Sequence, residues 1–262
     1  MAAIHGMIIQ FPINIEIGYI HIPSHLLFEV IAFYVAIRWY LHLKKDGASV
    51  FSDDERKLLL IGAAAGALFG SRVLGFLEHP GIMKTPLLIN ILTVKTIVGG
   101  LLGAIIGVEV VKKFFLKTKT SSGDLFVFPV ILGMGIGRIG CFLTGVTDST
   151  AGLPSSLPWA LQQGDAIARH PTSLYDIIFL SILGVLLYAY QNKTKLQPGV
   201  IFRLFIIAYM GYRFLIEFIK PVDSLFMGLS AIQLAAVGGF ISYVYSLSKN
   251  GLKIAGGKLE ES

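Results

Sequence analysis

The chain has 262 residues, of which 54% are hydrophobic and only 15% are charged, and its mean hydropathy is +0.72. Soluble domains carry about 25% charged residues, so this composition favours a membrane protein. The single cysteine predicts that the chain has no disulfide framework and no cysteine-based metal site. The net charge of +6 is not gathered into a basic stretch interleaved with aromatic residues, so nucleic-acid binding is not expected.

Seven stretches are apolar and long enough to cross a bilayer as helices, which takes about 20 residues each. They cover residues 25–43, 57–77, 94–116, 125–146, 173–190, 199–219 and 227–247. The first residues have neither the basic region nor the cleavage site of a signal peptide, so they are expected in the mature protein. The fold class predicted is therefore an all-α integral membrane protein, a single domain over residues 1–262 with seven transmembrane helices.

The basic residues alternate from one connecting segment to the next. Segments 44–57 and 112–124 each hold four Lys or Arg residues, whereas segments 78–93 and 147–172 hold one each. The first 24 residues hold none, and the segment after the last span holds three. Because cytoplasmic loops are enriched in Lys and Arg, the N-terminus is predicted to lie outside and the C-terminus in the cytoplasm. The positive net charge is then a consequence of membrane topology.

Two spans carry glycines at four-residue intervals, and one outer loop is unusually long. Small residues at this spacing let transmembrane helices approach closely, which predicts helix packing for Gly62, Gly66, Gly70, Gly99, Gly103 and Gly107. The loop 147–172 is rich in Pro, Ser and Gly and contains Trp159. It is either a mobile loop with an interfacial aromatic anchor or a lid that binds substrate.

Three arginines lie in the outer parts of predicted spans: Arg72, Arg138 and Arg213. A charge at bilayer depth costs about 2.5–3.5 kcal/mol on insertion scales, so each needs a reason. Arg72 either snorkels to the interface or serves function, and Arg213 either forms a private i,i+4 ion pair with Glu217 or serves function. Arg138 has no acidic residue within four positions, so its counterion must come from another helix or from a ligand.

The stretch "GMGIGRIGCFLTG", residues 133–145, surrounds Arg138 with glycines, including Gly137 and Gly140. These glycines are denser than packing requires and would leave space for a cavity wall. A guanidinium binds phosphate through two parallel hydrogen bonds. Arginines at headgroup depth beside such a wall suit an anionic phospholipid, and they could stabilise a leaving phosphate without a metal ion.

Four motifs in order resemble the prolipoprotein diacylglyceryl transferase family of bacterial inner membranes. They are "GRIGCFLTG" (137–145), "LPWA" (157–160), "RHPTSLYD" (169–176) and "RFLIEFIKPVD" (213–223), with weaker echoes in "GSRVLGFLEH" (70–79) and "IVGGLLG" (97–103). The chain resembles a divergent member, since Cys141, Thr144 and Val146 stand where the family usually has two Asn and a Glu. Val98 stands where the family has a His.

The resemblance implies a seven-span enzyme, without a cofactor or metal, whose active face is extracytoplasmic. Its partners would be phosphatidylglycerol and the lipobox segment of a prolipoprotein. It would transfer the diacylglyceryl group to the lipobox cysteine thiol and release glycerol phosphate. The implied catalytic residues are Arg138, Arg213, His170 and Glu217, with Arg72, Cys141, Tyr175, Lys220, Gly137 and Gly140 binding substrate.

Within this assignment the two arginines Arg138 and Arg213 hold the phosphate, Glu217 orients Arg213, and His170 takes the proton of the acceptor. Cys141 is either a thiolate favoured by the nearby cation or a small apolar helix residue. Two other functions fit the same residues: a phospholipid-dependent transferase with a different acceptor, and a non-catalytic protein that binds or transports anionic lipid.

Overall fold

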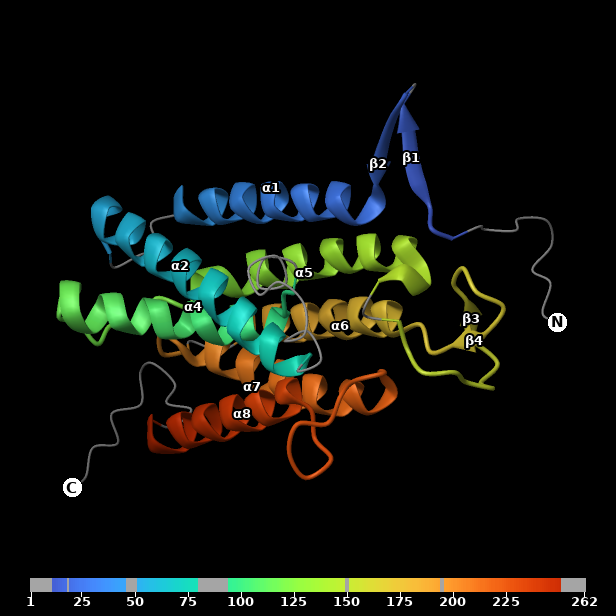
Figure 1. The fold of residues 1–262 in the computed structure, drawn as a ribbon. Coiled ribbons are helices and arrows are strands. Elements are labelled where there is room, and N and C mark those ends of the chain that lie inside the picture. The colour runs from blue at the N-terminus through green and yellow to red at the C-terminus, as the bar shows by residue number, and fades with distance from the viewer. Residues whose placement is uncertain are drawn as a thin grey trace. The chain divides into compact units, whose positions relative to one another are not determined.

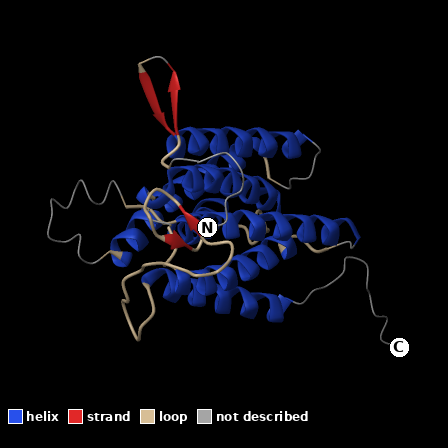
Figure 2. Cartoon of the chain, turned by 90° about the vertical axis from the view of Figure 1, so that its right-hand side faces the viewer, coloured by secondary structure: helices blue, strands red, loops and turns tan. Residues whose placement is uncertain are grey.

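The computed structural model describes residues 11–17, 19–45, 51–79, 94–148, 151–193 and 196–250. Helices dominate these ranges, and the paired strands form two short hairpins (Figure 2). The helices are α1 (Ser24–Lys45), α2 (Asp53–Glu78), α4 (Ile97–Val111), α5 (Asp124–Thr144), α6 (Thr172–Lys193), α7 (Val200–Ile216) and α8 (Ala231–Asn250) (Figure 1). One π-helical turn, η2 (Lys112–Leu116), continues α4, and the 3-10 turns η3 (Gly145–Thr147) and η4 (Glu217–Ile219) continue α5 and α7.

Each predicted span coincides with one of these helices, and the ends differ by a few residues. Among the residues that the structure describes, five helical segments are long and apolar enough to cross a membrane: α1, α2, α5 with η3, α6 and α8. Helices α4 and α7 have 15 and 17 residues, fewer than a full span requires without the turns that follow them. The prediction of a mostly helical membrane protein is therefore confirmed, whereas seven spans and the orientation of the termini stay predictions.

Large apolar side chains remain exposed along the helices. On α1, Phe33 and Tyr34 are exposed, and on α6, Ile178, Ile182 and Val185 are exposed. Soluble proteins rarely expose contiguous apolar surface of this kind. A surrounding bilayer would cover these side chains, and the helices satisfy their own backbone hydrogen bonds, as hydrocarbon demands.

Two hairpins are additions that the sequence did not predict. Strand β1 (Asn14–Ile17) pairs antiparallel with β2 (Ile20–Pro23), directly before α1, and this hairpin extends away from the start of the helix (Figure 1). Strand β3 (Leu161–Gln162) pairs antiparallel with β4 (Ala168–Arg169). The second hairpin lies inside the segment 147–172, so this long connection is partly ordered by backbone pairing.

The helices form two compact units, and each unit draws on separate stretches of the chain. The first unit contains β1, β2, α1, most of α5, the β3–β4 hairpin and most of α6, within residues up to Leu43, Phe128–Leu186 and Ile219–Pro221. The second contains α2, α4, η2, α7 and α8, together with the start of α5 and the end of α6. The single-domain organisation stays a prediction.

In the second unit, α2 and α4 meet along their glycines. A Cβ placed on Gly66 would collide with the carbonyl oxygen of Gly103, and one placed on Gly70 would collide with that of Gly99. Gly62 and Gly107 oppose each other in the same way at the next turn. The predicted packing role of these glycines is confirmed, because each carbonyl occupies the space that a side chain would need.

In the first unit, α5 packs between α1 and α6. On one face, Gly140 lies against Phe28 and His25 of α1, and a Cβ on Gly140 would come within 2.8 Å of the Phe28 Cβ. On another face, Gly184 of α6 lies against Ile131 of α5. These contacts fix which residues of α1 and α6 stand beside the glycine-rich stretch of α5.

Candidate functional site

Arg138 of α5 is buried and forms an ion pair with Asp176 of α6. The Nε atom of Arg138 lies 2.7 Å from Oδ2 of Asp176, and the two residues are only 4% and 3% exposed. The sequence required a counterion from another helix or from a ligand, and the structure supplies it from another helix. The pair holds the guanidinium beside Asp176, because opposite charges at this distance attract strongly when both are buried away from water.

Cys141 lies one helical turn after Arg138 and is buried as well. Its Sγ atom is 3.7 Å from Nη1 of Arg138 and 3.7 Å from Nδ1 of His25, on α1. The same Nδ1 lies 3.2 Å from Oδ2 of Asp148, which follows η3. Cys141 therefore lies between the guanidinium of Arg138 and the imidazole of His25.

The two glycines of the predicted cavity wall have different surroundings. Apart from its two chain neighbours and the nearby backbone of α5, no atom of the described residues lies within 4 Å of the position that a Cβ would take on Gly137. Gly140 packs tightly against α1, as described above, so its position serves helix packing. Open space next to Arg138 is therefore found at Gly137, and a contact of Gly140 with substrate stays a prediction.

His170 and Tyr175 come together at the start of α6. Nδ1 of His170 lies 3.3 Å from the hydroxyl of Tyr175, and the indole Nε1 of Trp159 donates to the same hydroxyl at 2.7 Å. The backbone N–H of His170 donates to the carbonyl of Leu153. These bonds attach the segment between η3 and α6 to the helix, so Trp159 is held by α6 in this structure.

A second ion pair of the first unit lies outside the helices, in the segment between η3 and α6. Arg169 of β4 donates through Nη2 to Oδ2 of Asp165 at 2.7 Å and through Nε at 3.1 Å. This guanidinium holds the pKa of the Asp165 carboxyl below its usual range. The pair closes the turn between β3 and β4.

In the second unit, Arg213 and Glu217 form the ion pair that their spacing allows. Both side chains are buried, and Nη2 of Arg213 contacts Oε1 of Glu217. Arg72 of α2 donates through Nη1 to the carbonyl of Val94 at 2.9 Å, so it is tied to backbone close to α4. Lys220 is buried and belongs to the short Ile219–Pro221 segment of the first unit.

Glu78, at the end of α2, is a buried carboxyl that the sequence did not assign a role. It is 2% exposed, and its Oε2 atom accepts the backbone N–H of Ile232 at 3.0 Å. The first N–H groups of a helix have no partner within the helix. Glu78 therefore caps the start of α8 and joins α2 to α8 within the second unit.

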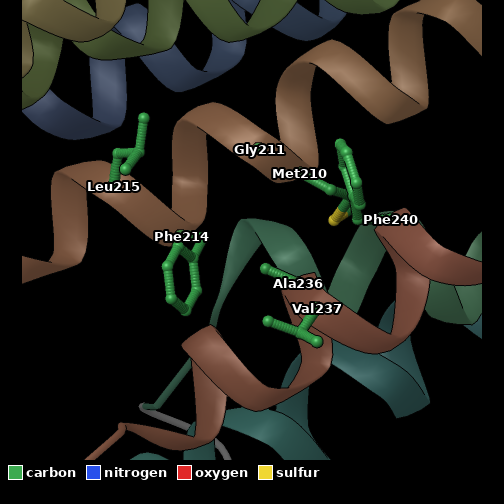
Figure 3. Close-up of a pocket in the computed structure, with 7 residues that line it drawn as sticks. All are labelled: Met210, Gly211, Phe214, Leu215, Ala236, Val237 and Phe240. Atoms are coloured by element: carbon green, nitrogen blue, oxygen red, sulfur yellow. The ribbon is translucent and has the colours of Figure 1, made fainter.

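An apolar pocket of about 270 Å³ lies between α7 and α8 (Figure 3). Its lining is Met210, Gly211, Phe214, Leu215, Ala236, Val237 and Phe240. This lining offers no charged or hydroxyl side chain for chemistry. It suits hydrocarbon, in contrast to the polar cluster around Arg138.

The sequence missed three members of the cluster around Arg138 as site residues: His25, Asp148 and Asp176. Asp176 ends the motif "RHPTSLYD", but nothing in the sequence identified it as the partner of Arg138. His25 is 116 residues before Cys141 in the chain, and Asp148 follows Cys141 after the last turn of α5. Spacing rules for metal or catalytic motifs address neighbours in sequence and could not relate them.

The fold and the site define a class: a mostly helical membrane protein that buries charged side chains and a cysteine within its helices. Comparison with known proteins narrows this class. The model of the family "Prolipoprotein diacylglyceryl transferase" matches residues 12–248. The chain therefore belongs to the prolipoprotein diacylglyceryl transferase family, a family of transferases, as the four sequence motifs predicted.

Individual relatives support the same assignment over most of the chain. The phosphatidylglycerol–prolipoprotein diacylglyceryl transferase of Methylobacillus flagellatus is 32% identical over 86% of this chain and 88% of its own length. The protein of the same name from Bordetella avium is 33% identical over 84% of this chain and 85% of its own length. The one from Zymomonas mobilis is 27% identical over 81% of this chain.

Proposed function

We propose that this chain transfers the diacylglyceryl group of phosphatidylglycerol to the thiol of a lipobox cysteine in a prolipoprotein. The observation that carries the proposal is the family match over nearly the whole chain. In the reaction, the thiolate sulfur forms a bond to the glyceryl carbon that bears the phosphate oxygen. The bond between that carbon and oxygen breaks, and glycerol phosphate leaves with the electron pair.

Arg138 is the residue best placed to receive the phosphate. Its Nε is held by Asp176, which leaves the rest of the planar guanidinium fixed in direction. The open space at Gly137 lies one residue away on the same helix. A preoriented cation stabilises charge that develops on a leaving phosphate without reorganising during the reaction. Arg213, held by Glu217, is the second candidate for this role.

His170 is the candidate base for the acceptor thiol. Its ring contacts the hydroxyl of Tyr175 through Nδ1, which orients the imidazole. An imidazole nitrogen can accept a proton from a thiol within hydrogen-bonding reach. Trp159 and Tyr175 would then hold the preceding loop against the helix that carries the site.

The proposed location is the bacterial inner membrane, with seven spans and the active face outside the cytoplasm. The positive-inside distribution of Lys and Arg supports an external N-terminus and a cytoplasmic C-terminus. In this orientation the start of α1, the end of α5 and the start of α6 face outward. A C-terminal reporter that functions only outside the cytoplasm should be inactive, and an active one would contradict this topology.

The activity is tested with purified full-length protein, phosphatidylglycerol vesicles and a lipobox peptide. Mass spectrometry should detect a diacylglyceryl thioether on the peptide, and no product with a peptide whose cysteine is replaced by serine. Arg138→Ala should abolish the product. The matched control is Arg38→Ala, an exposed arginine on α1, which should keep the activity.

Two results would contradict the proposal. If wild-type protein binds phosphatidylglycerol through Arg138 but modifies no thiol peptide, the protein is a lipid-binding protein or uses another acceptor. If Arg138→Ala forms product as fast as Arg38→Ala, then Arg138 does not stabilise the leaving phosphate.

A further inference from the structure

Three side-chain atoms that could bind a metal ion lie close together in the first unit, beside Arg138. They are a ring nitrogen of His25 from the first turn of α1, Sγ of Cys141 from the last turn of α5, and a carboxylate oxygen of Asp148 just after η3. All three lie within 4.8 Å of one another. The proposed transfer reaction assigns no role to His25 or Asp148.

The spacing of these atoms matches the edges of a metal tetrahedron. With Zn–S of about 2.3 Å and Zn–N or Zn–O of about 2.0 Å, tetrahedral angles put S and N about 3.6 Å apart and N and O about 3.3 Å apart. The observed separations are 3.7 Å for Sγ of Cys141 to Nδ1 of His25 and 3.2 Å for Nδ1 to Oδ2 of Asp148. A thiolate, an imidazole and a carboxylate suit zinc and its neighbours, and a thiolate does not suit calcium or magnesium.

The surroundings of the three donors also favour a cation. The other ring nitrogen of His25, Nε2, lies 3.7 Å from Oε2 of Glu29, on the next turn of α1. A carboxylate on the second nitrogen of a ligating histidine is common in metal sites, where it sets the orientation of the ring.

Three protein ligands leave a fourth tetrahedral position for another molecule, as catalytic zinc sites do. The side chain of Asp148 is 8% exposed and that of His25 is 34% exposed, so the approach to the site passes His25. A thiol that coordinates a metal ion is deprotonated. The proposed reaction needs the thiolate form of an acceptor cysteine, and Arg138, the proposed phosphate ligand, lies beside Cys141.

We propose that His25, Cys141 and Asp148 bind a divalent metal ion of the zinc class, and that the open position takes the thiolate of the acceptor cysteine. The identity of this thiolate rests on the proposed function. The acceptor thiol loses its proton when it binds the metal, and His170, the candidate base of the proposed function, accepts that proton. Its sulfur then bonds to the glyceryl carbon, and the phosphate oxygen leaves with the electron pair toward Arg138.

Cobalt is the probe for metal binding, because it reports the ligand type by absorption. Full-length protein in detergent should bind about one Co²⁺ per chain, with an absorption band from thiolate-to-cobalt charge transfer. Cys141→Ala should abolish this band, and His25→Ala and Asp148→Asn should each weaken cobalt binding by at least about tenfold. His21→Ala removes an exposed histidine of β2 and should leave binding unchanged.

A second measurement needs no variant. Cys141 is the single cysteine of the chain, so alkylation by a maleimide reports on this residue alone. Bound Zn²⁺ should slow its alkylation at least about tenfold, because the metal holds the thiolate sulfur. A band that survives in Cys141→Ala, or alkylation that is insensitive to Zn²⁺, would overturn the proposal.

The open position is tested with the lipobox peptide. Cysteine peptide should change the cobalt spectrum, and the serine peptide should not. An unchanged spectrum with the cysteine peptide would overturn the assignment of the fourth ligand. Metal-free protein that forms the thioether at full rate would refute the metal proposal and leave the proposed function standing. A peptide-dependent spectrum without any thioether product would refute the proposed function and leave the metal site standing.

Discussion

The ion pair between Arg138 and Asp176 should behave as a strongly coupled unit in stability measurements. We consider Arg138→Met, Asp176→Leu and the double variant that combines them. Each single variant leaves the other charge buried without this partner, because both residues are at most 4% exposed and the pair is 2.7 Å apart. Removing one member of a buried pair costs about 3–5 kcal/mol, while replacing both with apolar residues is often nearly neutral.

The expected coupling is therefore large. Each single variant should lower the free energy of unfolding by about 3–5 kcal/mol, which is a factor of about 10² to 10⁴ in the unfolding equilibrium. The double variant should lose much less unfolding free energy than the two single variants together, so that its stability is close to that of the wild type. The pair Lys57–Asp54 is exposed on the first turns of α2 and serves as the matched control. Its coupling should be negligible, because surface ion pairs are screened by water.

The assay is reversible unfolding in mixed detergent micelles, followed by far-UV circular dichroism on all variants. If the losses of the two single variants add to within about 0.5 kcal/mol in the double variant, the two side chains do not interact. The ion pair would then not hold the Arg138 guanidinium in place, and the argument for its fixed direction would fail.

Two further predictions concern the glycine seam and the outer loop. Gly66→Val should strongly destabilise the α2–α4 contact, because the Gly103 carbonyl fills the space of the new side chain. Gly100→Ala should be tolerated, because the nearest atom to the new Cβ would lie 3.7 Å away. Thermal unfolding of the two variants tests this difference. The Asp165–Arg169 pair lowers the pKa of the Asp165 carboxyl. The stability that this pair gives the loop is therefore fully present above the ordinary carboxyl range near pH 4 and is lost as the pH falls through the lowered pKa. The sensitivity of the 147–172 loop to protease should therefore rise in acid. The Asp165→Asn variant should show this higher sensitivity already at neutral pH, with no further rise in acid. If its protease sensitivity depends on pH as in the wild type, the pair does not stabilise the loop.

Much of the fold follows from properties that are local in the sequence. The predicted spans are stretches of about 20 mostly apolar residues, and such a stretch can be recognised without knowing which helices pack against it. The four-residue spacing of Gly62, Gly66 and Gly70 predicts a flat helix face, and the structure confirms that it packs against another glycine face. The Arg213–Glu217 pair was readable too, since residues four apart lie on one side of a helix.

The sequence by itself thus determined the helices, their glycine faces, the family and the arginines to examine. Only the tertiary structure decided that Asp176 is the partner of Arg138 and that His25 and Asp148 meet at Cys141. The β1–β2 and β3–β4 hairpins were also beyond the sequence, because such short strands carry little periodicity. The physical reason is the range of the interactions: helical periodicity repeats within a few residues, whereas an ion pair or a ligand cluster depends on which faces of distant helices pack together.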